Sequence, residues 1–407
     1  MKKKRTQTEK NNIINAILLG GICSVSYFVV YFGRNILSAV TPQMLEIETF
    51  TTEYIGVISS AFFICYAIGQ LINGIIGDKI KAKYMMSFGL ILAGCCNFAF
   101  PSATASHQWA YAVYGLMGLF LSMFYAPMTK LVAENTEPVY TVRCSLGYEF
   151  GALLGAPIAG LVSAKLLWRD VFQVGGFTLL SMGIFCLIIF SAMEQKRIIR
   201  YNQYQLPKER AKNQGGIRLL IEHRIIKFTV IAIITGVVRT TVVFWLPAYI
   251  AQYLGFSSEG AVKIYTVATL VISLTAFIAV FIYEKLHRNM DLTILLAFVS
   301  ASVMFLLVFF VKIPEMNIVF LILAIMSSNS AAAMLWSRYC PSLRDTGMVS
   351  SATGFLDFVS YGAASISSTI FANAVTTIGW EKLILVWLGL MIIGILISFP
   401  KTCKFSI

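Results

Sequence analysis

Long apolar stretches separated by short polar ones recur along the whole chain. A membrane-spanning helix needs about 20 mainly apolar residues, and twelve stretches reach that length. We expect spans at roughly 13–40, 53–76, 84–104, 109–131, 143–165, 171–193, 226–253, 260–283, 291–312, 316–336, 347–374 and 380–399. The pattern predicts an all-α polytopic membrane protein.

One polar stretch is much longer than the others. Residues 194–225 contain EQKRIIRYNQYQLPKERAKNQGG, which is basic and includes Pro207 and a glycine pair. Such a composition is typical of a loop. We therefore expect an N-terminal six-helix bundle at 1–193, a cytoplasmic linker at 194–225 and a C-terminal six-helix bundle at 226–407.

The net charge of +13 at pH 7 raises the question of nucleic-acid binding. If both termini and alternate loops share one side, that side holds 25 of the 32 Lys and Arg residues. This asymmetry follows the positive-inside rule. It indicates a multi-pass inner-membrane protein with cytoplasmic termini, and Lys130 is interpreted as part of this pattern. No nucleic-acid partner is expected.

The two halves contain matching landmarks. An arginine precedes a proline by eight positions twice, at Arg34 and again at Arg239. The pairs Asp78–Lys79 and Glu284–Lys285 follow spans 2 and 8, and carboxylates occur in spans 5 and 11, at Glu149 and Asp357. The offsets between these copies lie between 205 and 208 residues, which indicates a duplicated six-helix unit.

Twelve spans, a long central loop and the segment GIIGDKIKAK after span 2 resemble the major facilitator superfamily. Within it, the repeated arginine-to-proline spacing resembles the organophosphate:phosphate antiporters, as do WLPAYI, Tyr125–Ala126–Pro127 and ATGFLDFVSYGAA. The resemblance implies that Arg34 and Arg239 hold a phosphate. The chain departs from the glycerol-phosphate carriers at Gln70, where they have a basic residue, and at Phe150, where they have a histidine.

The residues themselves support an anion site. Placing an arginine at the centre of a membrane helix costs about 2.5–3.5 kcal/mol on insertion scales, so it should face a watery cavity or a partner. The planar donor fork of arginine matches two oxygens of a phosphate or carboxylate. Symmetry-related Arg34 and Arg239 would meet one anion near the midplane, where carriers bind substrate. The alternative is that each arginine is a structural partner of a buried acid.

Glu149 and Asp357 are candidates for charge balance and proton coupling. Burial raises a carboxyl pKa and a nearby arginine lowers it, so a carboxylate that changes environment can carry a proton. Contact with an ammonium group of the substrate, or a static polar contact between helices, remains open for both.

Several aromatic residues are candidate substrate contacts. Tyr27 and Tyr31 precede Arg34 by seven and three positions and share its helical face. Tyr125, Trp245 and Tyr361 are further candidates. Simple packing is the alternative for all five.

The residues after spans 2 and 8 are assigned to gating. In the resembled superfamily this loop ties helices together and influences the balance between inward-open and outward-open states. We expect Asp78 to interact with the electropositive N-terminus of a neighbouring helix. Lys79, Glu284 and Lys285 are assigned the same role through the motif and the repeat.

These features predict an alternating-access carrier, a monomer, for a small organic anion, with phosphate or protons as the coupling ion and no cofactor. A proton-coupled carboxylate or zwitterion carrier is one alternative, and a transport-like sugar-phosphate sensor is another. An enzyme is less consistent with the sequence, because His107, His223 and His287 lie in or near loops without a metal or nucleophile cluster.

Overall fold

The computed structural model describes residues 7–45, 47, 49–50, 52–163, 165–201, 220–243, 246 and 249–399. Contacts between Cα atoms divide the chain into two units. Unit 1 comprises Met1–Leu220 and Cys340–Phe358, and unit 2 comprises Ile221–Tyr339 and Val359–Ile407. The segment Cys340–Phe358 thus belongs with the N-terminal helices, although the linker separates them in sequence.

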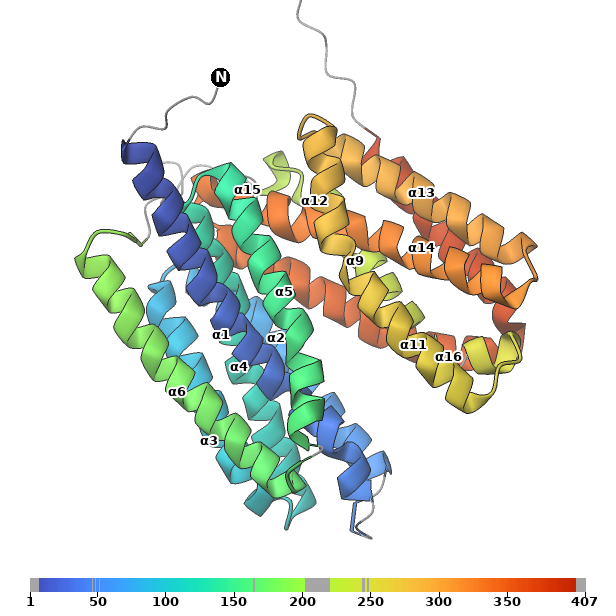
Figure 1. The fold of residues 1–407 in the computed structure, drawn as a ribbon, viewed down its shortest axis with the longest axis horizontal. Helices are drawn as coiled ribbons and strands as arrows, with labels where there is room; N and C mark the ends of the chain where they lie inside the picture. The colour runs from blue at the N-terminus through green and yellow to red at the C-terminus, as the bar shows by residue number, and fades with distance from the viewer. Residues whose placement is uncertain are drawn as a thin grey trace, which may run out of the picture. The chain divides into compact units, whose positions relative to one another are not determined.

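Six long helices form most of unit 1 (Figure 1). They are α1 (Gln7–Leu45), α2 (Thr52–Gly77), α3 (Ala82–Ala103), α4 (His107–Asn135), α5 (Pro138–Ser163) and α6 (Trp168–Gln195). Helix α1 packs along α5, α2 along α4, and α3 against both α4 and α6. The first six expected spans are therefore confirmed as helices, with α1 starting several residues earlier than its apolar run.

Glycines let α1 and α5 approach closely. A Cβ added at Gly151 of α5 would lie 2.5 Å from the carbonyl oxygen of Ser24 in α1. Small residues at helix contacts are a common means of close packing between membrane helices. Because the obstacle is backbone, a side chain at position 151 requires a shift of one whole helix.

Gly151→Ala is expected to destabilise the protein by about 1–3 kcal/mol, the usual cost of overpacking. Gly160→Ala in the same helix is the matched control, since a Cβ there meets no atom within 4 Å. That substitution should be neutral or stabilising by up to about 1 kcal/mol through helix propensity. Thermal unfolding in detergent measures both changes. Equal unfolding midpoints for the two variants would contradict the close-packing argument.

Unit 2 contains α9 (Ile225–Val237), the π-helical segments η1 (Val238–Val242) and η2 (Tyr249–Tyr253), α11 (Ser258–Ser273), α12 (Thr275–Lys285), α13 (Met290–Phe310), α14 (Pro314–Met334) and the π-helical η3 (Leu335–Tyr339). Helix α14 packs against α13, α12 and α9. The short α15 (Cys340–Ser342) and η4 (Leu343–Thr346) follow in unit 1. Helix α16 (Val349–Ser398) belongs to unit 1 up to Phe358 and to unit 2 beyond it.

Ten helices of the described chain are long and apolar enough to cross a membrane. The expected span 226–253 is not one regular α-helix, because it includes η1 and η2. The expected span 260–283 breaks at Leu274. There the hydroxyls of Ser273 and Thr275 bond to the carbonyls of Thr269 and Ile272, and such bonds bend helices.

The expected spans 347–374 and 380–399 are joined as α16, with a sharp break at Gly379. Its backbone has φ 77° and ψ 168°. This region of positive φ is open essentially to glycine alone. The chain therefore turns between the two spans without a separate loop.

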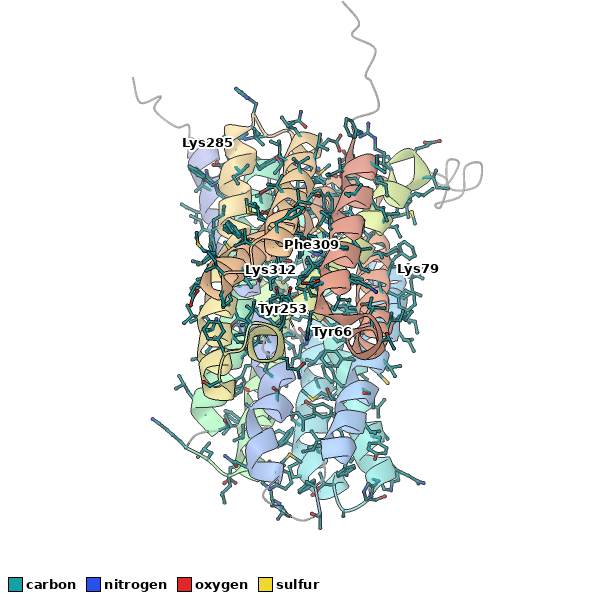
Figure 2. All side chains as sticks on the ribbon, turned by 90° about the vertical axis from the view of Figure 1, so that its right-hand side faces the viewer. Tyr66, Lys79, Tyr253, Lys285, Phe309 and Lys312 are labelled. Atoms are coloured by element: carbon teal, nitrogen blue, oxygen red, sulfur yellow. The ribbon has the colours of Figure 1, made fainter. Side chains whose placement is uncertain are left out.

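Lys312 connects three parts of unit 2. Its Nζ lies 2.6 Å from Oε1 of Glu381 and donates to the Tyr253 hydroxyl at 3.0 Å. It also lies 5.5 Å from the centre of the Phe309 ring (Figure 2). Because exposed ion pairs contribute little energy, we interpret this group as a local contact between three segments of unit 2.

Candidate functional site

Arg34 lies in the C-terminal half of α1 among aromatic rings. Its guanidinium carbon lies 5.3 Å from the ring centres of Tyr31 and Phe63 and 5.0 Å from that of Tyr66. Contacts between a cation and a ring contribute about 0.5–2 kcal/mol, most where water is excluded. Arg34 is half-buried, and the rings thus stabilise its charge within the apolar run of α1.

The tyrosines next to Arg34 form an aromatic cluster of edge-on and stacked rings. The Tyr27 ring lies 5.0 Å from Tyr31, 5.4 Å from Tyr125 and 6.0 Å from Tyr148, measured between ring centres. Tyr27 and Tyr125 are buried. The structure therefore brings together three of the predicted contacts, Tyr27, Tyr31 and Tyr125, from α1 and α4.

Both predicted carboxylates belong to unit 1. Asp357 is buried in the first part of α16, and Glu149 is partly exposed in α5. Tyr125 is within electrostatic range of both, and Tyr27 is within range of Glu149. Two acids 208 positions apart in sequence thus share one tyrosine neighbour, which the repeat alone did not indicate.

Arg239 belongs to unit 2 and lies in the π-helical segment η1. Its guanidinium carbon is 5.9 Å from the centre of the Tyr361 ring. Single π-helical turns are rare and occur frequently at functional sites. The two arginines related by the repeat therefore differ in local backbone, since Arg34 lies in a regular α-helix. Trp245 lies outside the described residues.

A second cluster joins the end of α2 to the start of α16. The Asp78 carboxylate accepts the backbone N–H of Ser350 at 3.0 Å and that of Ser351 at 2.8 Å. These are the second and third residues of α16, whose first amides have no partner within the helix. The predicted interaction of Asp78 with a helix N-terminus is thus present. We call Asp78, Lys130, Ser350 and Ser351 the Asp78 clamp.

Lys130 of α4 completes the clamp. Its Nζ donates to the backbone oxygens of Gly77 at 3.3 Å and Asp78 at 2.8 Å, and it lies 3.8 Å from Oδ1 of Asp78. The Lys130 side chain is only 5% exposed and that of Asp78 10%. Interpreting Lys130 as one more surface charge of the positive-inside pattern was therefore incomplete, because its ammonium group is buried and bonded.

Glycines allow the clamp to form. A Cβ at Gly74 of α2 would lie 2.8 Å from the Ser350 carbonyl oxygen and 3.0 Å from Cα of Gly354. The two backbones therefore meet with no side chain between them. This contact brings the end of α2 to the first turn of α16.

Burial raises the pKa of Asp78 above its ordinary value, and the Ser351 bonds, the Lys130 charge and the Ser350 amide oppose that rise. Asp78 therefore takes up a proton at a higher pH than an exposed aspartate does. Protonation removes the negative charge that faces the helix N-terminus, so acidification weakens the clamp before it neutralises exposed carboxylates.

The other three residues assigned to gating are exposed. Lys79 follows Asp78 in the turn after α2, and Glu284 and Lys285 end α12 (Figure 2). The Lys285 ammonium lies 4.8 Å from the Phe281 ring centre in its own helix. Glu284, the repeat mate of Asp78, is thus exposed, whereas the Asp78 side chain is largely buried. The sequence repeat alone does not indicate this difference.

Sequence reasoning missed Phe63, Tyr66, Tyr148 and the clamp partners Ser350 and Ser351. A signal existed for Tyr66, because it precedes Gln70 by four positions and so shares its helical face. No local pattern marks Ser350 or Ser351. Within the described residues, no group of three His, Cys, Asp or Glu could hold a metal ion.

Comparison with known families gives a match to the Major Facilitator Superfamily over residues 23–368. The phosphoglycerate transporter protein of Salmonella typhimurium is 21% identical over 388 residues, which cover 88% of this chain and 82% of the relative. The glycerol-3-phosphate transporter of Bacillus subtilis is 22% identical, covering 58% of each chain.

Another relative is the membrane sensor protein UhpC of Salmonella typhimurium, 25% identical over 180 residues. This match covers 43% of the chain and only 39% of the sensor's length. Among solved structures, FucP in the outward conformation aligns over 95% of this chain with a TM-score of 0.68 and 14% identity. That likeness supports the fold.

Proposed function

The chain belongs to the Major Facilitator Superfamily. We propose that it is a secondary active transporter of a small organic anion, and that this anion is an organophosphate. The observation that carries the proposal is the pair of arginines in the first helix of each repeat. Relatives named as transporters of phosphoglycerate and glycerol 3-phosphate support the substrate class.

Arg34 and Arg239 are the proposed substrate ligands. A phosphate accepts several charge-assisted hydrogen bonds, and each guanidinium offers a planar fork of donors. The rings of Tyr31, Phe63 and Tyr66 stabilise the Arg34 charge through their faces, while recognition of the anion depends on the in-plane N–H donors. Tyr27, Tyr31, Tyr125, Trp245 and Tyr361 are proposed as further substrate contacts.

The two six-helix halves, 1–193 and 226–407, are proposed to alternate access around this site, with 194–225 as the connecting linker. The Asp78 clamp is proposed as a gating element, because it joins the end of α2 to the first turn of α16. We place both termini in the cytoplasm from the charge asymmetry, and we treat the carrier as a monomer.

The proposed transport is tested with purified protein in liposomes preloaded with phosphate. Wild-type protein should catalyse exchange of external labelled phosphate for internal phosphate, and added organic phosphates should compete. A folded wild-type protein without exchange would contradict the organophosphate assignment. Carboxylates and zwitterions under a pH gradient would then be the next substrates to measure.

Glu149 and Asp357 are proposed to balance the charges of Arg34 and Arg239 in the empty carrier, and at least one of the two carboxylates to carry a coupling proton. Glu149→Gln should flatten the pH dependence of uptake while the uptake rate at the optimum changes by less than about tenfold, because the amide keeps the shape but not the titration. Glu315→Gln is the control, since Glu315 is exposed in the first turn of α14. An unchanged pH profile in Glu149→Gln would remove the proton role.

A transport-like sensor is the second candidate, supported by the match to the UhpC sensor. A sensor would bind organic phosphate without moving it across the membrane. Measuring ligand-induced thermal stabilisation and phosphate exchange on one preparation separates the two functions: stabilisation with exchange indicates a carrier, and stabilisation without exchange indicates a sensor.

A further inference from the structure

A polar cavity lies in unit 1 where several helices end. Its volume is about 400 Å³, and its lining includes Asn15 near the start of α1, the α4–α5 turn, the chain after α6 and Arg344 of η4. Asn15 precedes Arg34 by nineteen residues on the same helix, or about 28 Å at 1.5 Å per residue. The cavity is therefore distinct from the proposed substrate site.

Three arginines line this cavity: Arg197, Arg200 and Arg344. Arg197 has a backbone feature that is unusual for its residue type. Helix α6 ends in a turn. There the backbone N–H of Arg197 donates to the backbone oxygen of Glu194 at 3.0 Å, and that of Ile198 donates to the backbone oxygen of Met193 at 2.9 Å. In this turn the residue at position 197 takes a left-handed conformation, with φ 57°, and glycine is the usual occupant.

Among the described residues Arg224, His287 and Arg288 also have positive φ and lie at helix boundaries, so this conformation by itself does not indicate a ligand. Glycine at position 197 would remove the strain and also remove a guanidinium from the cavity. The argument for a ligand therefore rests on the cavity and the three arginines that line it.

The chain after α6 is held firmly beside the cavity. The Asn135 side chain accepts the Arg200 N–H at 2.7 Å and donates to the Arg200 carbonyl at 2.9 Å. Ile199, between the two arginines, is only 1% exposed. Arg197 and Arg200 thus project from an anchored segment, which lowers the ordering cost of binding.

The charges of the cavity favour an anion. The lining has three arginines and two acidic side chains, Glu134 and Glu137. The Glu134 carboxylate lies 4.0 Å from the Lys130 ammonium, and Arg344 lies 3.6 Å from Asp345. The N-terminus of α5, a helix of 26 residues, opens beside the same turn and carries a partial positive charge.

We propose that this cavity is a second, peripheral binding site for a phosphate-bearing anion, held by Arg197 and Arg200 with Arg344. Arginine forks match phosphate oxygens, and a cavity of about this volume accommodates a small phosphate ester. Arg344 comes from the segment Cys340–Phe358, so the bound anion stabilises the packing of that segment on α4 and α5. The phosphate comes either from a soluble ion or from an anionic lipid headgroup, since basic pockets at helix ends bind both.

The soluble arm measures thermal unfolding of the full chain in neutral detergent against inorganic phosphate. All proteins carry Arg34→Gln, so that the proposed substrate site does not contribute. Arg197→Gln should weaken phosphate affinity at least about tenfold, the value of one charge-assisted bond. Lys196→Gln is the matched control, because Lys196 is the exposed neighbour and does not line the cavity; its affinity should change less than about twofold.

Arg197→Gly provides a second variant with an opposite signature. It should raise the unfolding midpoint without ligand, because glycine relieves the left-handed strain, and still lose the phosphate-induced shift. A general packing role for Arg197 would instead lower the midpoint without ligand, which contradicts the proposal.

The lipid arm compares phosphatidylglycerol with phosphatidylcholine adducts by native mass spectrometry in the same variants. Phosphatidylglycerol adducts that disappear in Arg197→Gln and persist in Lys196→Gln identify a lipid headgroup as the ligand. A phosphate shift with that dependence identifies a soluble anion. If neither readout distinguishes Arg197→Gln from Lys196→Gln, the proposed site is wrong.

Discussion

Arg34→Lys is expected to lower phosphate exchange in proteoliposomes by about 100-fold or more. Lysine keeps the charge but loses the planar pair of donors, and two charge-assisted hydrogen bonds of about 1.5 kcal/mol each correspond to that factor. The ammonium also stacks less well on Tyr31, Phe63 and Tyr66, which surround the guanidinium. Initial rates of labelled phosphate entry measure the effect.

Arg169→Lys is the matched control for this substitution. Arg169 also lies over an aromatic ring, 5.2 Å from the Trp168 ring centre, but it is exposed in the first turn of α6. Its replacement should leave exchange within about twofold, as is usual for surface substitutions. Full exchange in a folded Arg34→Lys protein would contradict the anion-ligand role.

Arg239→Lys should cause a loss of similar size if the two arginines hold one anion. Groups that share a ligand are coupled, so the double variant should lose much less than the product of the two single losses. Independent losses that multiply would instead indicate two separate roles. This comparison therefore tests the shared site, and not only the importance of each residue.

Asp78→Ala is expected to loosen the segment Cys340–Phe358 by about 2–4 kcal/mol. The change removes two bonds to the first amides of α16 and leaves the buried Lys130 ammonium without its Asp78 carboxylate; losing one partner of a buried pair is costly. Native thiols report the result. Alkylation of Cys340, which is fully buried in this segment, should accelerate by about 30-fold or more, following the same free energy.

Two references make the Asp78 result specific. Cys186 of α6 is equally buried in unit 1, so its alkylation should stay slow if only the segment loosens. Asp170→Ala changes an exposed aspartate in the first turn of α6 and should cost less than about 1 kcal/mol. Equal acceleration at Cys340 and Cys186 would indicate global unfolding and contradict a local clamp.

Much of the fold was predictable because a bilayer imposes it. Helices must satisfy their own backbone groups in lipid, and their length must match the apolar layer. The apolar runs therefore indicated α1 to α6 and most helices of unit 2. The breaks at Leu274 and Gly379 depend on local hydrogen bonds and packing, which hydropathy does not register. The same holds for the π-helical segments η1 and η2.

The apolar runs alone identified the charges that need an explanation, because ionisable residues inside such runs are costly and rare. These charges are Arg34, Arg239, Glu149 and Asp357. The neighbours of these charges follow from helix packing. It surrounded Arg34 with Phe63 and Tyr66, and it brought Asp78 to amides 272 and 273 positions away. The reason is physical: insertion cost is a property of one residue in its own helix, whereas a contact depends on how separate helices pack.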